Sequence, residues 1–366
     1  MGSSTLQSAI NTSELTSTPL VLDSVLPNIS QALDGTGFIF GAGASYEAGY
    51  PMMPKLTQEI IAALDSTEQT TLYEVLDAAK ITSDSDKGTP NIEELADAVI
   101  AHHTNTNEPR FKALETKFRQ LILQALLSVE SPDLTNHVRF FEKLKARAYG
   151  QPCTVWIWTT NYDLLLEKAA SIAGVQVENG FTGTTERYFT PNTFQRVSGT
   201  LESRTFGRQT FNQDNKLVVK LIKLHGSISW CKEGDKIYER HPHAICSDAE
   251  RVMIMPRRRK VMDTLISPYD SLFSLSTRVL GNQCKYLAGC GFSFSDDHIN
   301  ENLFFPVVNG AKCHLSVLSD YEPAAVSGIM SLPNYTGGYE SHLRIKGQET
   351  KGATDLWQFS KFVELF

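Results

Sequence analysis

The sequence predicts an α/β fold: a doubly wound parallel (Rossmann-like) sheet with an inserted helical module. Short apolar runs alternate with segments in which apolar residues recur at every third and fourth position. That alternation is typical of a parallel sheet covered by helices on both faces. In addition, residues 55 to about 149 hold almost only helical patterns, and several apolar runs end in Gly, Asn, Asp or His.

The first third of the chain indicates a tail, one strand and a large insertion. Residues 1–20 are rich in Ser and Thr and are expected to be a flexible tail, and 22–35 have helical spacing. The apolar run 38–40 is the first strand. The helical stretch is too long for a single crossover, so we interpret about 52–150 as a helical insertion within one domain, 21–366.

The rest of the chain continues the alternation. Residues 178–215 have few apolar runs and are interpreted as loops and short hairpins. The further expected strands are 154–163, 217–227, 251–256, 285–293 and 313–319, and the expected helices are 164–174, 268–281 and 354–366. The last helix has an apolar face that we expect to pack on the core.

Composition restricts the class of protein. The chain has 366 residues, 41% hydrophobic residues and a formal net charge of -7, which favours a globular protein and disfavours direct nucleic-acid binding. The basic run 257–260 is a local exception, either a solvated turn or a contact to a partner or phosphate. Apolar runs are too short for a membrane span. Six scattered cysteines without a CxxC pair favour reduced thiols and a cytoplasmic location.

A glycine turn follows the first strand in "GFIFGAGASYEAG", residues 37–49. Gly41 and Gly43 allow backbone N–H groups to approach an anion, and a following helix N-terminus would add positive potential. The third position of a dinucleotide fingerprint would be Tyr46, so that motif is incomplete. The alternative is a plain strand-to-helix turn.

Polar residues also end the next strands. In "TTNYD", Asn161 offers a carboxamide and Asp163 a carboxylate, although Asp163 could equally cap the following helix. In "KLHGSISW", His225 leaves a buried strand beside Gly226, and histidine accepts protons near neutral pH. The alternative for His225 is a satisfied core histidine. Because carboxyl ends of parallel strands meet at one edge, these side chains should converge there.

Together, "GAGAS", "TNYD", "HGS" and "GCGFSFSDDHIN" resemble the motifs of sirtuin-like NAD-binding domains in order and spacing. They span about residues 36–320. The chain is more similar to bacterial sirtuin-like NADases of anti-phage defence than to protein deacylases. After the glycine loop it reads "AGYPMMPKL", where deacylases carry Gly-Ile-Pro-Asp-Phe-Arg, and it lacks their two CxxC zinc pairs.

The resemblance implies a role for each matching residue. NAD+ would be consumed as substrate, with Asn161, Asp163 and His225 as the catalytic group. The residues implied to contact the cofactor are Gly41, Ala42, Gly43, Ala44 and Ser45 at the pyrophosphate, and Gly291, Ser293, Asp296, His298 and Asn300 at the adenosine half. No zinc is expected, because Cys231, His241, His243 and Cys246 have irregular spacing for a metal site.

The resemblance further implies a homo-oligomer and a HerA-type hexameric ATPase as partner, with the stretch 252–273 most similar to that version. Two other functions stay open from the residues. A protein deacylase would release nicotinamide only when an acyl-lysine peptide is present. A non-enzymatic NAD or ADP-ribose sensor would not need Asn161 and His225. A nuclease is disfavoured by the acidic balance and the lack of a paired-carboxylate metal motif.

Overall fold

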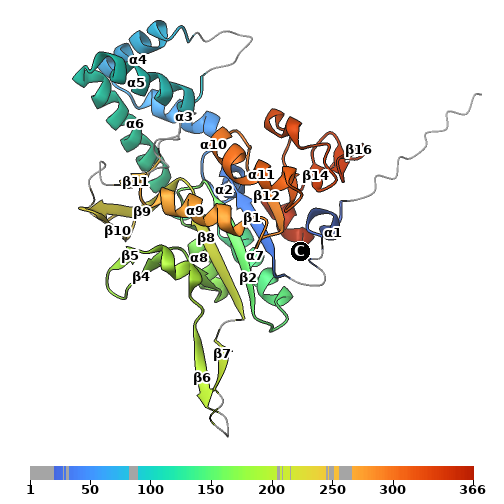
Figure 1. Ribbon diagram of the computed structural model, residues 1–366. Helices are drawn as coiled ribbons and strands as arrows, with labels where there is room; N and C mark the ends of the chain where they lie inside the picture. The colour runs from blue at the N-terminus through green and yellow to red at the C-terminus, as the bar shows by residue number, and fades with distance from the viewer. Residues whose placement is uncertain are drawn as a thin grey trace, which may run out of the picture.

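Figure 1 shows the computed structural model, which describes residues 20–27, 29, 33–81, 90–203, 207, 209–214, 216–244, 246, 251–254 and 266–366. The expected flexible tail lies outside these residues except for Leu20, which is buried in the core. The basic run 257–260 also lies outside them.

The centre of the fold is a nine-stranded sheet in the order β16-β15-β14-β13-β12-β1-β2-β8-β3. The strands from β14 to β3 are parallel, and β15 and β16 are antiparallel additions at one edge. Their bounds are β1 Thr36–Phe40, β2 Cys153–Thr159, β3 Gln176–Glu178, β8 Leu217–Lys223, β12 Tyr286–Cys290, β13 His314–Leu318, β14 Tyr335–Gly338, β15 Leu343–Ile345 and β16 Gln348–Thr350. β1 and β8 are buried along their whole length, because both faces of the sheet are covered. The predicted α/β fold is confirmed.

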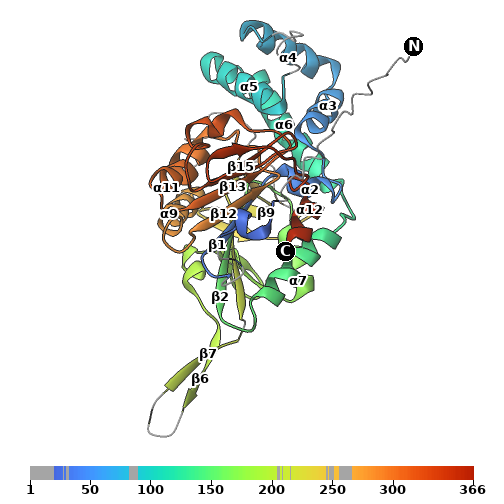
Figure 2. The same ribbon diagram turned by 90° about the vertical axis from the view of Figure 1, so that its right-hand side faces the viewer.

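Helices cover the two faces of this sheet (Figure 2). One face carries α1 Leu22–Val25, α7 Thr135–Arg147, α8 Leu165–Ala173 and α12 Phe359–Leu365, which pack on side chains such as Phe38 and Phe40. The other face carries α9 Tyr269–Val279, α10 Asp297–Ile299, a π-helical turn Asn300–Phe304 and α11 Phe305–Asn309. Ile39 points to this second face, as the two-residue period of a strand requires. α12 packs on the core, as expected.

A group of helices is inserted between β1 and β2. After the short α2, Ala42–Tyr46, come α3 Met53–Ala62, α4 Ser66–Ala78, α5 Ile92–Thr106 and α6 Pro109–Leu127. α3 to α6 stand at one end of the molecule (Figure 1) and share a hydrophobic core to which Ile228 and Met253 also contribute. α4 and α5 each begin with a capping box, at Asp65 and Asn91, which fixes where they start. α7 differs, since it packs on α8 and α12 against the sheet.

A smaller antiparallel sheet lies beside the large one, in the order β11-β9-β10-β5-β4. Its strands are β4 Phe181–Thr182, β5 Arg187–Phe189, β9 Gly226–Glu233, β10 Lys236–Glu239 and β11 Arg251–Met253. Of the strand expected at 251–256, residues 251–253 form β11, which pairs with β9 in this sheet, and residues 255–256 lie outside the described residues. A hairpin of β6 Gly199–Ser203 and β7 Gln209–Gln213 projects from the body (Figures 1 and 2), and two short 3-10 helices span Pro191–Gln195 and Ala324–Gly328.

A disulfide joins Cys231 on β9 to Cys246. The expectation that all six cysteines are reduced is therefore wrong at these two positions. The fold brings the two residues to a Cα–Cα distance of 6.3 Å, although 15 positions separate them in the sequence. The other four cysteines, at positions 153, 284, 290 and 313, are free and buried.

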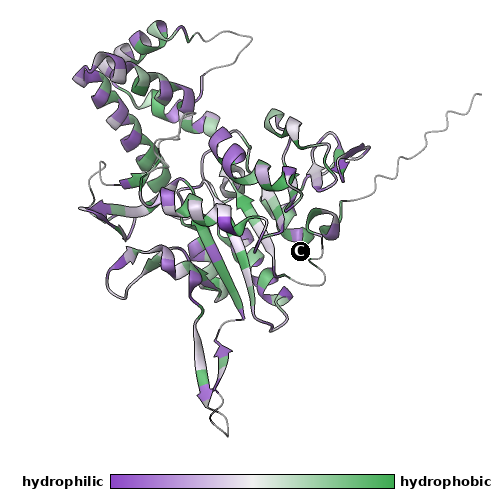
Figure 3. Cartoon of the chain, viewed as in Figure 1, coloured by the Kyte–Doolittle hydropathy of each residue, from purple (hydrophilic) through white to green (hydrophobic). Residues whose placement is uncertain are grey.

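Hydropathy follows the layers (Figure 3). The central strands are the most continuously hydrophobic segments, whereas the helices alternate hydrophobic and hydrophilic residues along their length. Within the described ranges, no helix combines the length and the apolar character needed to cross a bilayer.

Candidate active site

The carboxyl ends of β13, β12, β1, β2 and β8 lie at one edge of the central sheet, because these neighbouring strands are parallel. The glycine turn follows β1, Asn161 and Asp163 follow β2, and His225 follows β8. The polar residues that follow these strands therefore lie along the same edge of the sheet.

The glycine turn packs closely on the end of β12. Gly43 N donates to Gly291 O at 3.0 Å, and a Cβ on Gly43 would lie 2.7 Å from Gly291 Cα. Gly291 has a φ of +61°, and a Cβ there would lie 2.4 Å from Ala44 N. Glycine is thus required at both positions for the backbones to approach. Ala44 is buried in the core, and its N–H donates to Gly41 O.

Ser45 connects the glycine turn to Asp163. Its hydroxyl donates to Asp163 Oδ2 at 2.7 Å and accepts from Asn161 Nδ2 at 2.8 Å. Asn161 Nδ2 also donates to Gly41 O at 2.8 Å. Both amide hydrogens of Asn161 are therefore used to hold the side chain, and its carbonyl oxygen is the atom that could face a ligand.

Asp163 is 6% exposed and makes the helix-capping contact that was one of its two alternatives. Its Oδ1 accepts from Leu165 N at 3.0 Å at the start of α8, while Oδ2 faces Ser45. Its backbone oxygen contacts Lys223 Nζ. Asp163 also affects a neighbouring residue. Burial, together with the negative charges of Asp163 and Glu167, raises the pKa of Tyr50 well above its usual range.

His225 is 7% exposed and faces Asp296, with Nε2 lying 3.0 Å from Oδ2. Asp296 Oδ1 accepts from Ile299 N at 3.1 Å, so the carboxylate also caps α10. The backbone around His225 is fixed too, since Ile254 N donates to His225 O at 2.9 Å. Gly226 has a φ of +86°, and a Cβ there would lie 2.1 Å from the carbonyl oxygen of Val252.

A pocket of about 360 Å³ lies beside the glycine turn and the end of β12. It is lined by Gly43, Gly291 and Ser293, which the resemblance assigns to the cofactor. The described lining does not include His298 or Asn300. His298 instead lies near Asn302 and against the ring of Phe273. Asn300 is buried, and its Nδ2 donates to Phe294 O at 2.6 Å.

Sequence reasoning missed part of this pocket. Ser319 and Asp320 line it from the end of β13, and Trp357, Gln358 and Phe359 line it from the segment that leads into α12. Ser319 and Asp320 follow an apolar run in the same way as "TTNYD" does, so their place in the site could have been predicted from the sequence. The residues near α12 carried no such signal, because only tertiary packing brings them to the site.

The residues considered for a metal site do not form one in the structure. Cys231 and Cys246 are joined in the disulfide, and the rings of His241 and His243 lie 5.6 Å apart. Across the part of the chain that is described, no group of three or more His, Cys, Asp or Glu side chains could hold a metal ion.

Residues 155–306 match the model of a family described as a SIR2-like domain. The match begins in β2 and ends in α11, so it contains Asn161, Asp163, His225 and Asp296 but not the glycine turn. This match supports the interpretation of this region as a sirtuin-like domain and, in general terms, an NAD-related activity. The chain has no match among curated proteins.

Proposed function

We propose that this protein is an NAD+ glycohydrolase, which cleaves the nicotinamide–ribose bond with water. The observation that carries the proposal is the placement of Asn161 and His225 after the ends of the neighbouring strands β2 and β8. Asn161 is held there by Gly41 and Ser45, and His225 is held by Asp296. The SIR2-like match over residues 155–306 supports NAD+ as the ligand.

In this reaction the C1′–N bond breaks, and its electron pair leaves with nicotinamide, which becomes neutral. Because the leaving group departs neutral from a cationic ring, no general acid is needed. The transition state resembles an oxocarbenium ion. Water attacks C1′ from the opposite face, and its proton must be removed. The products are nicotinamide, ADP-ribose and one proton, so atoms and charge balance.

His225 is the group suited to accept that proton. With Nε2–H donating to Asp296, Nδ1 is the ring nitrogen that carries no hydrogen and can act as a base. The carbonyl oxygen of Asn161 would orient the water or a ribose hydroxyl. The pocket lined by Gly43, Gly291 and Ser293 would hold the adenosine side of the dinucleotide, next to the glycine turn.

We extend the proposal to the role in the cell. The motif resemblance supports cytoplasmic NAD+ depletion as an effector step of bacterial anti-phage defence. It also supports control by self-assembly or by a HerA-type ATPase, since an unregulated NADase would harm its own cell.

The test is nicotinamide release from NAD+, measured by chromatography, with and without candidate partners and with no peptide present. His225→Ala and Asn161→Ala should each lower the rate by about 10²–10⁴-fold if they act as general base and water-positioning group. Matched controls are His243→Ala and Asn212→Ala, which alter exposed residues outside the site and should retain the wild-type rate.

Other functions predict different results. A deacylase would release nicotinamide only after an acyl-lysine peptide is added. A sensor would bind NAD+ and leave it intact. Wild-type rates in both His225→Ala and Asn161→Ala would show that the assignment of the site is wrong.

A further inference from the structure

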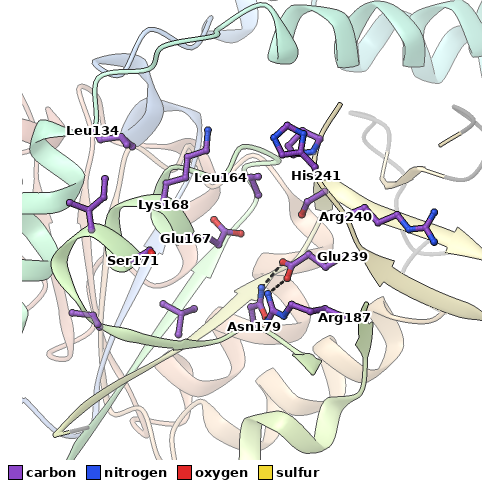
Figure 4. Close-up of a pocket in the computed structure, with 15 residues that line it drawn as sticks. Leu134, Leu164, Glu167, Lys168, Ser171, Asn179, Arg187, Glu239, Arg240 and His241 are labelled. Carbon is purple, nitrogen blue, oxygen red and sulfur yellow. Dashed lines mark hydrogen bonds and ion pairs between the residues drawn. The ribbon is translucent and has the colours of Figure 1, made fainter. Parts of the chain in front are cut away.

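The hairpin of β6 and β7 projects from the body as an arm (Figures 1 and 2). The arm leads into the amino end of β8, whereas His225 follows the carboxyl end of that strand. The pocket beside the glycine turn and a cavity of about 700 Å³ between α8 and β10 (Figure 4) include no residue of the arm in their described linings. The arm is therefore a surface feature and not the wall of a small-molecule site.

The arm exposes an apolar pair to solvent. Leu201 on β6 lies directly opposite Phe211 on β7, and the exposed fractions of these residues are 63% and 49%. A Cβ on Gly199 would lie 2.3 Å from the ring of Phe211, so this ring lies across Gly199. A two-stranded hairpin alone is only marginally stable in water, and further strands stabilise it. The arm would therefore gain stability from a strand that extends its sheet.

β7 offers an edge for such a strand, since within the described structure its sheet contains only β6 and β7. Asp214 N donates to Ser198 O at 3.0 Å, which sets the alternation of the ladder. The backbone groups of Thr210 and Asn212 point towards β6, and those of Phe211 point away from it. β7 has no charged residue and no proline, which are the usual protection of an edge strand. Its edge can therefore pair with another strand.

The strand is complementary to a second copy of itself. Its residues are, in order, Gln209, Thr210, Phe211, Asn212 and Gln213. Antiparallel pairing of two copies about Phe211 places Phe beside Phe, Thr beside Asn and Gln beside Gln. Opposed aromatic rings and opposed hydrogen-bonding side chains are favourable cross-strand pairs, and no like charges meet. β6 is less suited to such pairing, because it contains Gly199 and the charged Glu202.

We propose that the edge of β7 is a homodimer interface, at which two copies of this chain pair antiparallel about Phe211 and join their arms into one sheet. The two-fold axis passes between the two copies of Phe211, so both chains use the same surface. The outward N–H and C=O of Phe211 bond to the same residue of the second copy. The side chains of Phe211 and Leu201 from both copies share one face of the joined sheet. The proposal does not depend on NAD+ chemistry.

A disulfide that requires this register tests the pairing. Thr210 of one copy lies opposite Asn212 of the other, in a pair without direct backbone bonds, for which the Cα atoms are about 4.5 Å apart. A disulfide fits this distance. A mixture of Thr210→Cys and Asn212→Cys chains should therefore cross-link under mild oxidation with copper phenanthroline. Each chain alone should not, because its cysteines are two places out of register. The four free cysteines of the wild-type chain are buried, so wild type should stay uncross-linked.

Sedimentation velocity of the whole chain measures the association itself. One short strand from each copy buries less surface than a standard interface, so we expect a dissociation constant of about 10–100 μM. Phe211→Asp places like charges opposite each other at the two-fold axis and should weaken association at least about tenfold. Tyr73→Asp is the matched control, since Tyr73 is 65% exposed on α4, at the other end of the molecule (Figure 1). It should associate as wild type does.

Three outcomes would overturn the proposal. The first is no association at about 200 μM, and the second is equal association of Phe211→Asp and wild type. The third is cross-linking through β6, in a mixture of Thr200→Cys and Glu202→Cys chains, in place of the β7 pair. Cross-linking of the β7 pair would uphold the interface even if Phe211→Asp unfolds the arm. A chain that dimerises in this way but leaves NAD+ intact would uphold the interface and refute the proposed hydrolase.

Discussion

Nε2 of His225 lies 3.0 Å from Oδ2 of Asp296, although 71 positions separate the two residues in the chain. The sequence comparison by motif assigns Asp296 to the wall of the cofactor site. In the structure its carboxylate orients the histidine and caps α10 at the same time. This contact gives the sharpest prediction for catalysis.

Asp296→Asn should lower the rate of NAD+ cleavage by about 10²-fold. Asparagine can keep the acceptor for Ile299 N, but its NH₂ would face Nε2 and favour the tautomer with the hydrogen on Nδ1. Nδ1 of His225, the proposed base, would then carry a hydrogen and could not accept a proton. Nicotinamide release measures the rate, and the exposed neighbour Asp297→Asn should behave as wild type. A wild-type rate in Asp296→Asn would rule out this role.

Gly43→Ala should destabilise the protein by about 1–3 kcal/mol, because the new Cβ would lie 2.7 Å from Gly291 Cα and the backbones would have to separate. Urea unfolding measures the loss. Gly328→Ala is the matched control, since a Cβ there meets nothing within 4 Å. If the two variants were equally stable, the close approach of the two loops would not be a constraint.

Removing the disulfide should lower stability. The Cys231–Cys246 bond closes a loop of 15 residues, for which chain entropy predicts about 3 kcal/mol. Cys231→Ser with Cys246→Ser should therefore unfold at lower urea concentration than the oxidised protein. A thiol count under denaturing conditions should give four free cysteines per wild-type chain, and a count of six would contradict the bond.

Stability should also fall in mild acid because of His137. Burial lowers the pKa of His137 from 6.5 to about 4. Between these values the unfolded chain binds a proton that the folded chain excludes, so stability is complete above pH 6.5 and decreases as the pH falls towards 4. The slope for one such group is at most about 1.4 kcal/mol per pH unit.

His137→Phe tests this source of acid sensitivity, since its ring would replace the imidazole that packs 4.4 Å from the ring of Phe359. Urea unfolding at pH 7.5, 6 and 5 should show a flatter pH dependence in the variant than in wild type. His314, whose pKa burial also lowers to about 4, remains in both proteins and contributes to the residual slope. Parallel curves would exclude His137 as the cause.

The sheet could be predicted from sequence because its signals are local. Phe38, Ile39 and Phe40 form an apolar run that is followed by glycine, and the apolar runs of β2 and β8 are likewise followed by Asn161 and His225. The placement of β11, Arg251–Met253, could not be predicted, because its pairing with β9 depends on the turn at Gly226. A strand pattern does not state which sheet the strand joins.

The site was predicted in part for the same reason. Asn161, Asp163 and His225 follow strands whose order fixes them at one edge. The disulfide and the contribution of Trp357 to the pocket depend on contacts between segments that are distant in the sequence. Neither the spacing of the cysteines nor the pattern of an amphipathic helix predicts such contacts. His298 and Asn300 share a motif with Asp296, yet helical geometry turns them to other neighbours.

The late position of β12 has a consequence during synthesis. Gly43 and His225 leave the ribosome well before Gly291 and Asp296, which complete the glycine turn and orient the imidazole. A nascent chain that ends before β12 therefore holds most of its polar groups but not their final arrangement. The contacts of Gly43 and His225 can therefore be completed only when about four-fifths of the chain has been made.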